Sequence, residues 1–346
     1  MIKQIIYGLV LIMFTMSSCG DDTPEKTEYN DGVVIVNQGP FTTGTGTLTF
    51  KGRGTSTPSQ NIFSVSNDGA VLGNIAQSMI EHDGKNFISI NNGGKVVVTE
   101  NDAFTFIDTI SNINQGRYFA SNGSKLYLSA WGDTGSNGGV FEINSNSNSV
   151  ENYIELGNGP EGLVFVDNLL YIAKGGGFLR DSLVLIMDTD DNSIVKSIVV
   201  GDNPSLMVKD NDDNVYVICN GFTDFSDPTN STTGKIVKIA NQEIIYSQDI
   251  SGGFSSALSI DADNGFIYYL DAGQIIKESL NFDPSERKVI KVISASALGF
   301  DTEEDKLYIS DSKDNQSLGE VYVFSKDDVE IDSFTTGIVP GYFHFK

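Results

Sequence analysis

The chain has very few of the residues on which most enzymes depend. Its 346 residues include only two histidines, His82 and His344, and two cysteines, Cys19 and Cys219. So few imidazoles and thiols leave little material for acid–base catalysis, a thiol nucleophile or a zinc site. Neither histidine lies beside a Ser nucleophile elbow or a cysteine motif, so we expect both to be packing or hydrogen-bonding residues. The sequence therefore predicts a protein that is not an enzyme and that carries no cofactor or metal.

Basic charge and proline are also scarce. Lys and Arg total 22 against 46 Asp and Glu, a formal charge of −24. A chain this acidic cannot neutralise many phosphates, which excludes nucleic acid and makes anionic lipid headgroups poor partners. With 8 Pro, 36 Gly and 39% hydrophobic residues, the composition is that of a folded, turn-rich protein rather than a disordered one.

Long hydrophobic runs are missing as well. Ile5–Phe14 is apolar, but it is too short to span a bilayer, and with the basic Lys3 before it the segment is typical of a secretory signal. Its end, Thr15–Gly20, resembles a bacterial lipobox in which Cys19 is lipidated, although Met16 stands where Leu is usual. We therefore expect a signal peptide over residues 1–18 and a lipidated flexible tether over residues 19–30.

Acidic residues directly follow the expected lipidation site. Asp21 and Asp22 resemble the surface-export signal of Bacteroidota lipoproteins, which implies an outer-membrane protein that faces the cell exterior and contacts the membrane only through its lipid anchor. Retention on the inner, periplasmic leaflet is the alternative. If Cys19 is acylated, Cys219 has no intrachain partner, and its place in the β-branched run Val215–Cys219 predicts a small buried hydrophobe.

The remaining sequence repeats with a period of about 44 residues. Gly157–Leu163 recurs as Gly201–Leu206 and, in degenerate form, as Ile338–Tyr342. Weaker copies of the anchor position align at Gln77, Gln115, Phe254 and Ser294. This period is that of a β-propeller blade, and seven anchors predict seven blades in one domain, residues 31–346.

A second column of β-branched and aromatic runs follows the anchors and predicts the second strand of each blade. These runs are Asn86–Ile90, Leu126–Ser129, Leu170–Ala173, Val215–Ile218, Phe266–Tyr269 and Leu307–Ser310. Polar turns such as Asp83–Gly84 and Asn122–Gly123 separate them from the preceding strands.

The last anchor, Pro340, is followed by only one strand. Val33–Gly39, Gly46–Phe50 and Ile62–Val65 supply three candidate strands at the other end of the chain. We therefore predict an all-β, seven-bladed propeller in which N- and C-terminal strands share the closing blade, which removes the open sheet edges.

Three consecutive stretches, Leu170–Gly176, Val184–Thr189 and Val199–Pro204, resemble the blade pattern of YncE-like seven-bladed propellers. Together with the lipobox, the chain is similar to Bacteroidota surface lipoproteins of that group, which include a cobalamin-capturing partner of the outer-membrane vitamin B12 transporter. The resemblance implies a corrinoid or similar ligand and a TonB-dependent transporter as partner.

Several motifs that suggest chemistry have simpler explanations. Asp188–Asn192 and Asp210–Asn214 lack the Gly and Glu positions of a calcium loop, so we expect solvated hairpin turns. Gly175–Gly177 lacks the Lys-Ser/Thr and the helix of a phosphate loop, which favours a flexible blade loop.

The loops before each first strand and after each second strand should emerge on one side of the disc, and that side carries the unusual residues. Aromatic and charged side chains of this kind can stack on a flat ligand and orient it. The predicted ligand-binding residues are Phe41, Arg117, Tyr118, Trp131, Glu161, Lys174, Phe178, Arg180, Asn220, Phe222, Phe254 and Tyr342. Some of these rings could instead cap the grooves between blades.

The leading hypothesis is a surface lipoprotein that captures a scarce nutrient, with cobalamin or another corrinoid as the specific choice, and hands it to a transporter. A siderophore, a haem-like ring or a glycan would use similar side chains. The alternatives are a protein-interaction scaffold without a small ligand and, less favoured, a propeller enzyme such as a lactonase. The long loop Phe222–Gly234 could act as a lid over the mouth or contact a membrane partner.

Overall fold

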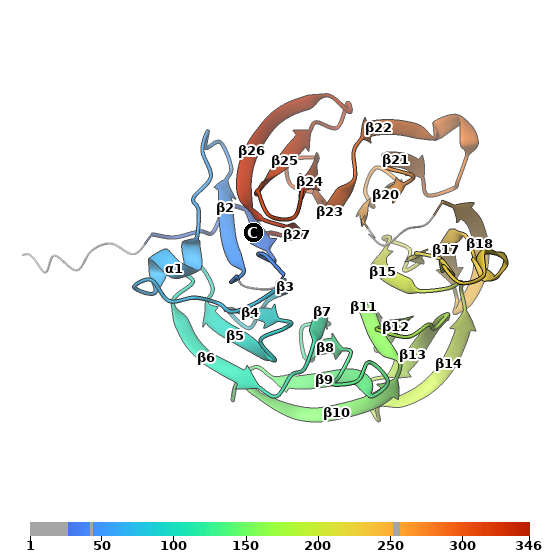
Figure 1. Ribbon diagram of the computed structural model, residues 1–346, viewed down its shortest axis with the longest axis horizontal. Coiled ribbons are helices and arrows are strands. Elements are labelled where there is room, and N and C mark those ends of the chain that lie inside the picture. Colours follow the sequence, from blue (N-terminus) through green and yellow to red (C-terminus); the bar gives the residue numbers. More distant parts are fainter. Residues whose placement is uncertain (1–26, 42–43, 252–256) are drawn as a thin grey trace, which may run out of the picture.

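The computed structural model describes residues 27–41, 44–251 and 257–346, and their strands form seven sheets arranged in a ring (Figure 1). The predicted seven-bladed propeller is therefore confirmed. The expected signal peptide, Cys19 and Phe254 lie outside the described residues, as does most of the expected tether.

Six blades contain four antiparallel strands each, numbered from the centre outward. Blade 1 comprises β3 (Ala76–His82), β4 (Lys85–Ile90), β5 (Lys95–Glu100) and β6 (Phe106–Ser111). Blade 2 comprises β7 (Gly116–Ser121), β8 (Leu126–Ala130), β9 (Gly138–Asn144) and β10 (Ser149–Gly157). Blade 3 comprises β11 (Gly159–Val166), β12 (Leu169–Gly176), β13 (Leu183–Asp188) and β14 (Ser193–Val199).

The other half of the ring repeats this order. Blade 4 comprises β15 (Pro204–Lys209), β16 (Val215–Cys219), β17 (Gly234–Ala240) and β18 (Glu243–Ile250). Blade 5 comprises β19 (Leu258–Asp261), β20 (Phe266–Asp271), β21 (Gln274–Ser279) and β22 (Lys288–Val292). Blade 6 comprises β23 (Ala295–Asp301), β24 (Lys306–Asp311), β25 (Leu318–Phe324) and β26 (Glu330–Ile338). Two short 3-10 turns, η1 (Pro228–Asn230) and η2 (Pro284–Glu286), lie in loops.

The second strand of each four-stranded blade is the one that the sequence predicted. All five residues of β8 and all five of β16 are buried, as expected for β-branched and aromatic strands covered on both faces by neighbouring blades. The turns before them have the predicted chemistry: Asp83 and Gly84, between β3 and β4, have φ angles of 49° and 71°. Two successive positive φ angles are what a tight two-residue hairpin requires.

The closing blade joins the two ends of the described chain. Its strands lie in the order β2 (Thr47–Gly52), β1 (Gly32–Asn37) and β27 (Pro340–Phe345), with β27 innermost (Figure 1). The register pairs Val33 with Phe345 and Ile35 with Phe343. The shared blade was predicted, and the structure confirms it.

The prediction of a third N-terminal strand in this blade is wrong. Residues Ile62–Ser66 form the short helix α1, and its Ile62 and Phe63 are buried against the closing blade. The run is rich in β-branched and aromatic residues, as a strand is, but only Ser59, before it, pairs with Phe50 on the outer edge of β2. Tertiary packing of two apolar side chains decides the conformation of so short a segment.

Ion pairs fasten the closing blade to both of its neighbours. On one side Arg53 contacts Asp301 of blade 6 at 3.1 Å and donates a hydrogen bond to the main-chain oxygen of Lys346 at 2.7 Å. On the other side the Lys346 ammonium lies 3.3 Å from the Glu81 carboxylate of blade 1. The Arg53, Asp301 and Lys346 side chains are buried, so removing one partner would leave an uncompensated buried charge, whereas Glu81 is partly exposed.

The apolar core lies mainly between adjacent blades. One cluster, for example, joins Tyr171 and Val184 of blade 3 to Val217, Cys219 and Val237 of blade 4. Cys219 is therefore the buried hydrophobe that the sequence predicted, and burial raises the pKa of its thiol to about 12. In the part of the chain that the structure describes, no helix is long and apolar enough to cross a membrane.

Candidate functional site

A cavity of about 1270 Å³ occupies the centre of the ring. The innermost strand of each blade contributes to its wall. Representative lining residues are Gln77, Arg117, Glu161, Ser205, Ser259, Ser296 and Tyr342. The volume exceeds the roughly 300–1,000 Å³ of most small-molecule sites, so the cavity has room for a large ligand.

The loops predicted to share one side of the disc do come together. Main-chain hydrogen bonds join the exit of a second strand to the entry of a first strand, from Asn91 to Ile75 at 2.8 Å and from Trp131 to Gln115 at 3.2 Å. We call this side the mouth.

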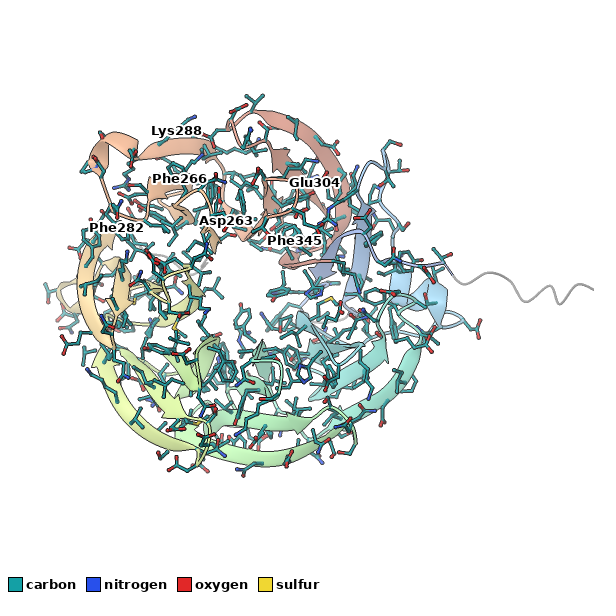
Figure 2. The ribbon with its side chains drawn as sticks, turned by 180° about the vertical axis from the view of Figure 1, so that it is seen from behind. Asp263, Phe266, Phe282, Lys288, Glu304 and Phe345 are labelled. Carbon is teal, nitrogen blue, oxygen red and sulfur yellow. The ribbon has the colours of Figure 1, made fainter. Side chains whose placement is uncertain are left out.

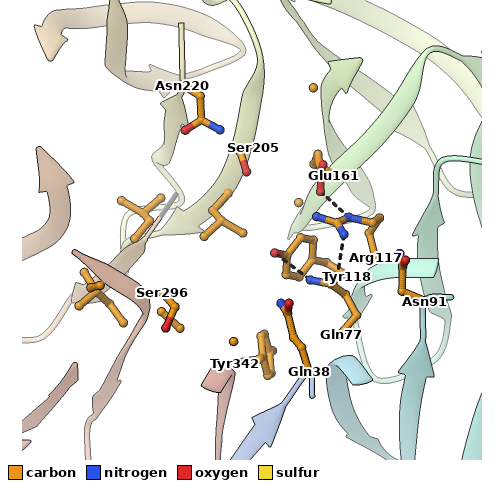
Figure 3. A pocket seen from close by; sticks show the side chains of 18 of the residues that line it. Gln38, Gln77, Asn91, Arg117, Tyr118, Glu161, Ser205, Asn220, Ser296 and Tyr342 are labelled. Atoms are coloured by element: carbon orange, nitrogen blue, oxygen red, sulfur yellow. Dashed lines mark hydrogen bonds and ion pairs between the residues drawn. The ribbon is translucent and has the colours of Figure 1, made fainter. Parts of the chain in front are cut away.

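Arg117 lies at the centre of a hydrogen-bonded cluster in the wall of the mouth (Figure 3). Its Nε donates to Glu161 Oε2 at 2.9 Å and its Nη1 donates to Gln77 Oε1 at 2.7 Å. The other oxygen of Glu161 accepts a hydrogen bond from Trp131 Nε1 at 3.0 Å, and Gln77 Nε2 donates to the Tyr118 hydroxyl at 3.3 Å. Three blades thus hold one guanidinium in a fixed orientation.

Burial sets the electrostatics of this cluster. Removal from water raises the pKa of the Glu161 carboxyl, although the Arg117 guanidinium and the hydrogen bonds act in the opposite direction. Burial also raises the pKa of the Tyr342 hydroxyl to about 12, so this group is neutral at physiological pH and can donate a hydrogen bond. In the described residues no acceptor is bonded to Nη2 of Arg117, which leaves its two N–H donors for a ligand.

Two glycines make room for the single tryptophan. A Cβ on Gly159 would lie 2.6 Å from Trp131 Cδ1, and one on Gly177 would lie 3.2 Å from Cγ. The Arg117 guanidinium stands 4.3 Å above the indole, and Phe178 contacts the ring edge-on at 5.3 Å. Gly175–Gly177 was predicted to be a flexible loop, but Gly175 and Gly176 belong to β12, and Gly177 packs against Trp131. Trp131 therefore orients Arg117 as well as lining the cavity.

A second aromatic pair lies beside this cluster. The Tyr118 and Tyr342 rings are 6.4 Å apart and tilted by 41°, and they belong to blade 2 and the closing blade. Both line the cavity, next to Gln38 (Figure 3). Rings at this position can contact a flat ligand that covers the mouth.

Most of the predicted ligand-binding residues line this cavity. They are Phe41, Arg117, Tyr118, Trp131, Glu161, Phe178, Asn220, Phe222 and Tyr342. Phe254 lies outside the described residues.

Two predicted site residues, Lys174 and Arg180, do not line the cavity, and salt bridges explain why. The Lys174 ammonium is buried and lies 3.0 Å from the Asp181 carboxylate. Arg180 pairs with Asp202, and its guanidinium stacks over the Phe222 ring at 4.4 Å. Asp181 and Asp202 thus hold the two cations away from the cavity, and the order of residues alone does not reveal these pairs.

The long loop between β16 and β17 has internal order. Asp224 accepts hydrogen bonds from the main-chain N–H groups of Ser226 and Asp227, and Asp227 caps η1 through Thr229. Thr232 Oγ1 donates to Asp202 at 2.6 Å, the same carboxylate that holds Arg180. These contacts hold the β16–β17 loop in place beside the mouth.

The sequence analysis missed the number of amide side chains at the cavity. Gln and Asn contribute eight lining residues: Gln38, Gln77, Asn91, Asn92, Gln115, Asn203, Asn220 and Asn315. Gln77 and Gln115 occupy anchor positions of the repeat, so the signal was present. Of the described lining residues only Arg117, Glu161 and Lys313 are charged, in a chain with a formal charge of −24.

The histidines lie away from this cavity. His82 is buried and its Nδ1 lies 2.9 Å from Ser121 Oγ, and His344 is partly buried in β27. Among the residues that the structure describes, no group of three or more His, Cys, Asp or Glu side chains could hold a metal ion.

Comparison with known proteins places the chain among propellers. A family model described as a domain of unknown function, DUF5074, matches residues 31–329. A search of the curated proteins found no match.

Solved structures share the fold at low sequence identity. A quinonprotein alcohol dehydrogenase-like protein from Bacteroides thetaiotaomicron is 16% identical with a TM-score of 0.70, over 92% of this chain and 79% of that one. A periplasmic gluconolactonase from Pseudomonas aeruginosa is 12% identical with a TM-score of 0.64, over 90% and 99% of the two chains. Hydrazine synthase from Kuenenia stuttgartiensis is 15% identical with a TM-score of 0.60, over 77% and 88%. At these identities the likeness shows the fold alone.

Proposed function

Since the chain belongs to the DUF5074 family, whose description leaves the activity open, we propose that it is a binding protein that captures a large, flat and mostly uncharged nutrient at the mouth of its central cavity. Cobalamin or another corrinoid is the specific ligand that we propose, and a TonB-dependent outer-membrane transporter is the proposed recipient.

One observation carries this proposal: the Arg117 cluster holds a guanidinium, a carboxylate, an amide and aromatic rings in fixed positions around an open cavity. The pair of Arg117 and Glu161 is close to neutral, so it suits hydrogen bonding to a polar ligand better than attraction of a strong anion. Rings at Tyr118 and Tyr342 offer apolar contact to a flat surface.

The amide lining supports the choice of a corrinoid. A corrin is a flat macrocycle whose rim carries amide side chains, and amides pair with amides because each offers both donor and acceptor groups. A haem-like ring or an acidic siderophore presents mainly carboxylates or similar anions, which would leave most of the lining amides without a matching amide partner. A neutral glycan could also form hydrogen bonds with these amides, although less specifically, and is the main alternative ligand.

Titration of the purified protein with cyanocobalamin tests the proposal. Trp131 is the single tryptophan, so a strongly absorbing ligand at the mouth should quench its emission. Replacement of Arg117 or Tyr342 by Ala should weaken binding by about 1–3 kcal/mol in calorimetry, as expected for residues that anchor a ligand. Ile245→Asn, on the exposed outer strand β18, is the matched control and should bind as the parent does. Unchanged emission together with no heat of binding would exclude corrinoid capture.

Delivery requires the protein to stay at the membrane. We propose that Cys19 carries the lipid anchor and that the propeller faces the cell exterior. Cys19→Ala should release the protein from membranes, because the lipid is the only hydrophobic anchor expected after signal cleavage. Membrane retention of a correctly processed variant would contradict the anchor, and protease treatment of intact cells tests the orientation separately.

Two other functions make different predictions. A scaffold propeller would bind a protein through exposed rings such as Phe41, and no metabolite would raise its melting temperature, whereas a ligand at one hundred times its Kd stabilises by about 2.7 kcal/mol. A lactonase, as some structural neighbours are named, would hydrolyse gluconolactones. We propose that the protein is not an enzyme, because the described cavity wall holds one carboxylate and no histidine.

A further inference from the structure

The polarity of the cavity changes with depth. Each innermost strand begins at the mouth and runs towards the reverse side of the disc, so residues later in the strand line the cavity at greater depth. Beyond the polar residues of the mouth, the last lining residue of six innermost strands is apolar. These residues are Phe119, Leu163, Val208, Ile260, Phe300 and Phe345.

The spacing of these residues gives the length of the apolar part. A regular strand rises about 3.3 Å per residue, so Phe119 lies up to about 7 Å deeper than Arg117, and Phe300 up to about 13 Å deeper than Ser296, with register shifts at the starts of β7 and β23 shortening both depths. Phe345 lies at the edge of the central opening on the reverse side of the disc (Figure 2). No charged residue lines this deeper part among the residues that the structure describes.

We infer that the deeper part of the cavity is a second subsite, which takes an apolar or aromatic arm that projects at right angles from a flat ligand. The inference rests on the proposed capture of a flat ring at the mouth. A wide polar ring is held at the mouth by the Arg117 cluster and the amides, because the apolar wall below offers its rim no hydrogen bonds. The channel runs along the axis of the disc, so only a group perpendicular to the ring enters it. Burial of that group against Val208, Ile260 and their neighbours removes apolar surface from water.

Two corrinoids that differ in such an arm test the subsite. Cyanocobalamin carries an aromatic base below the ring, on an arm that also contains a ribose and a phosphodiester, and dicyanocobinamide lacks this nucleotide. We expect cyanocobalamin to bind about ten- to a hundredfold more tightly in calorimetry, which is the effect of burying one aromatic group. Equal affinities would overturn the subsite and leave capture standing. If neither probe binds, both the proposed capture and the subsite that rests on it are refuted.

Variants separate the two parts of the cavity. Val208→Asn and Ile260→Asn place an amide in the apolar channel, and either should reduce the preference for cyanocobalamin to less than about threefold while dicyanocobinamide binds as before. Two positions are used because one substitution could impair folding, which thermal melting detects. Arg117→Ala should weaken both probes by the same factor, since both carry the ring. A preference that survives both channel substitutions in folded protein would show that the arm binds elsewhere.

Discussion

His344 should make the closing blade sensitive to acid. It lies on β27, where burial, with a smaller contribution from the Lys346 ammonium, lowers the pKa of its imidazole from 6.5 to about 4, against the opposing effect of Glu81. Its Nε2 is buried without a hydrogen-bond partner in the described residues, so a proton there would find no acceptor.

The sign and size of the effect follow from linkage. The folded state stays uncharged at His344 while the unfolded state takes up a proton below pH 6.5, so stability present at neutral pH is lost as the pH falls towards 4. Each pKa unit corresponds to about 1.36 kcal/mol. This one group should therefore cost about 2 kcal/mol at pH 5 and about 3 kcal/mol at pH 4.

The assay is urea unfolding of the parent and of His344→Gln at pH 7, 6, 5 and 4.5. The free energies of the two proteins should converge, or cross, as the pH falls, because Gln removes the titration and leaves the other groups unchanged. Ile35→Val, a buried change in the same blade, is the control: it should lower the free energy of unfolding by about 1 kcal/mol at every pH. A constant difference between the parent and His344→Gln would refute the argument.

Three further predictions concern the cluster, the ring and the thiol. Glu161→Ala leaves Arg117 and the Trp131 N–H without their shared acceptor. The substitution should lower the free energy of unfolding in urea by about 1–3 kcal/mol and weaken ligand binding. An unchanged midpoint of urea unfolding would contradict the buried pair. Deletion of Gly341–Lys346 removes most of β27 and should cost several kcal/mol of a margin of about 5–15, so a truncated protein that melts within a few degrees of the parent would mean that the ring closes differently. Cys219 should react with a thiol reagent only after denaturation, and rapid labelling of the native protein would contradict its burial.

The sequence was sufficient to predict the ring because its period is encoded locally. Each second strand is a run such as Leu126–Ala130, and the turns before these runs are built from Asp, Asn and Gly, so pattern and turn chemistry agree at every blade. The helix α1 could not be predicted, because Ile62 and Phe63 would be equally apolar in a strand and only the packing in the closing blade distinguishes the two.

The site was only partly predictable for a different reason. The repeat placed Arg117, Trp131 and Glu161 on the same side, and the structure brings them into one hydrogen-bonded cluster. Salt bridges depend on distances that the repeat does not specify, so the capture of Lys174 by Asp181 could not be foreseen. Gln77 and Gln115 occupy anchor positions of the repeat, but the repeat alone does not show that their side chains line the cavity.

The shared closing blade determines when the site can exist during biosynthesis. Arg117 and Glu161 leave the ribosome early, but Tyr342 and the rest of β27 are among the last residues described, and the cavity wall lacks one side until they pair with β1. A nascent chain that has emerged as far as blade 6 holds nearly all of the wall and still presents an open arc. The cavity wall is therefore complete only once β27 has paired with β1, and a chain clipped before Tyr342 would lack one side of it.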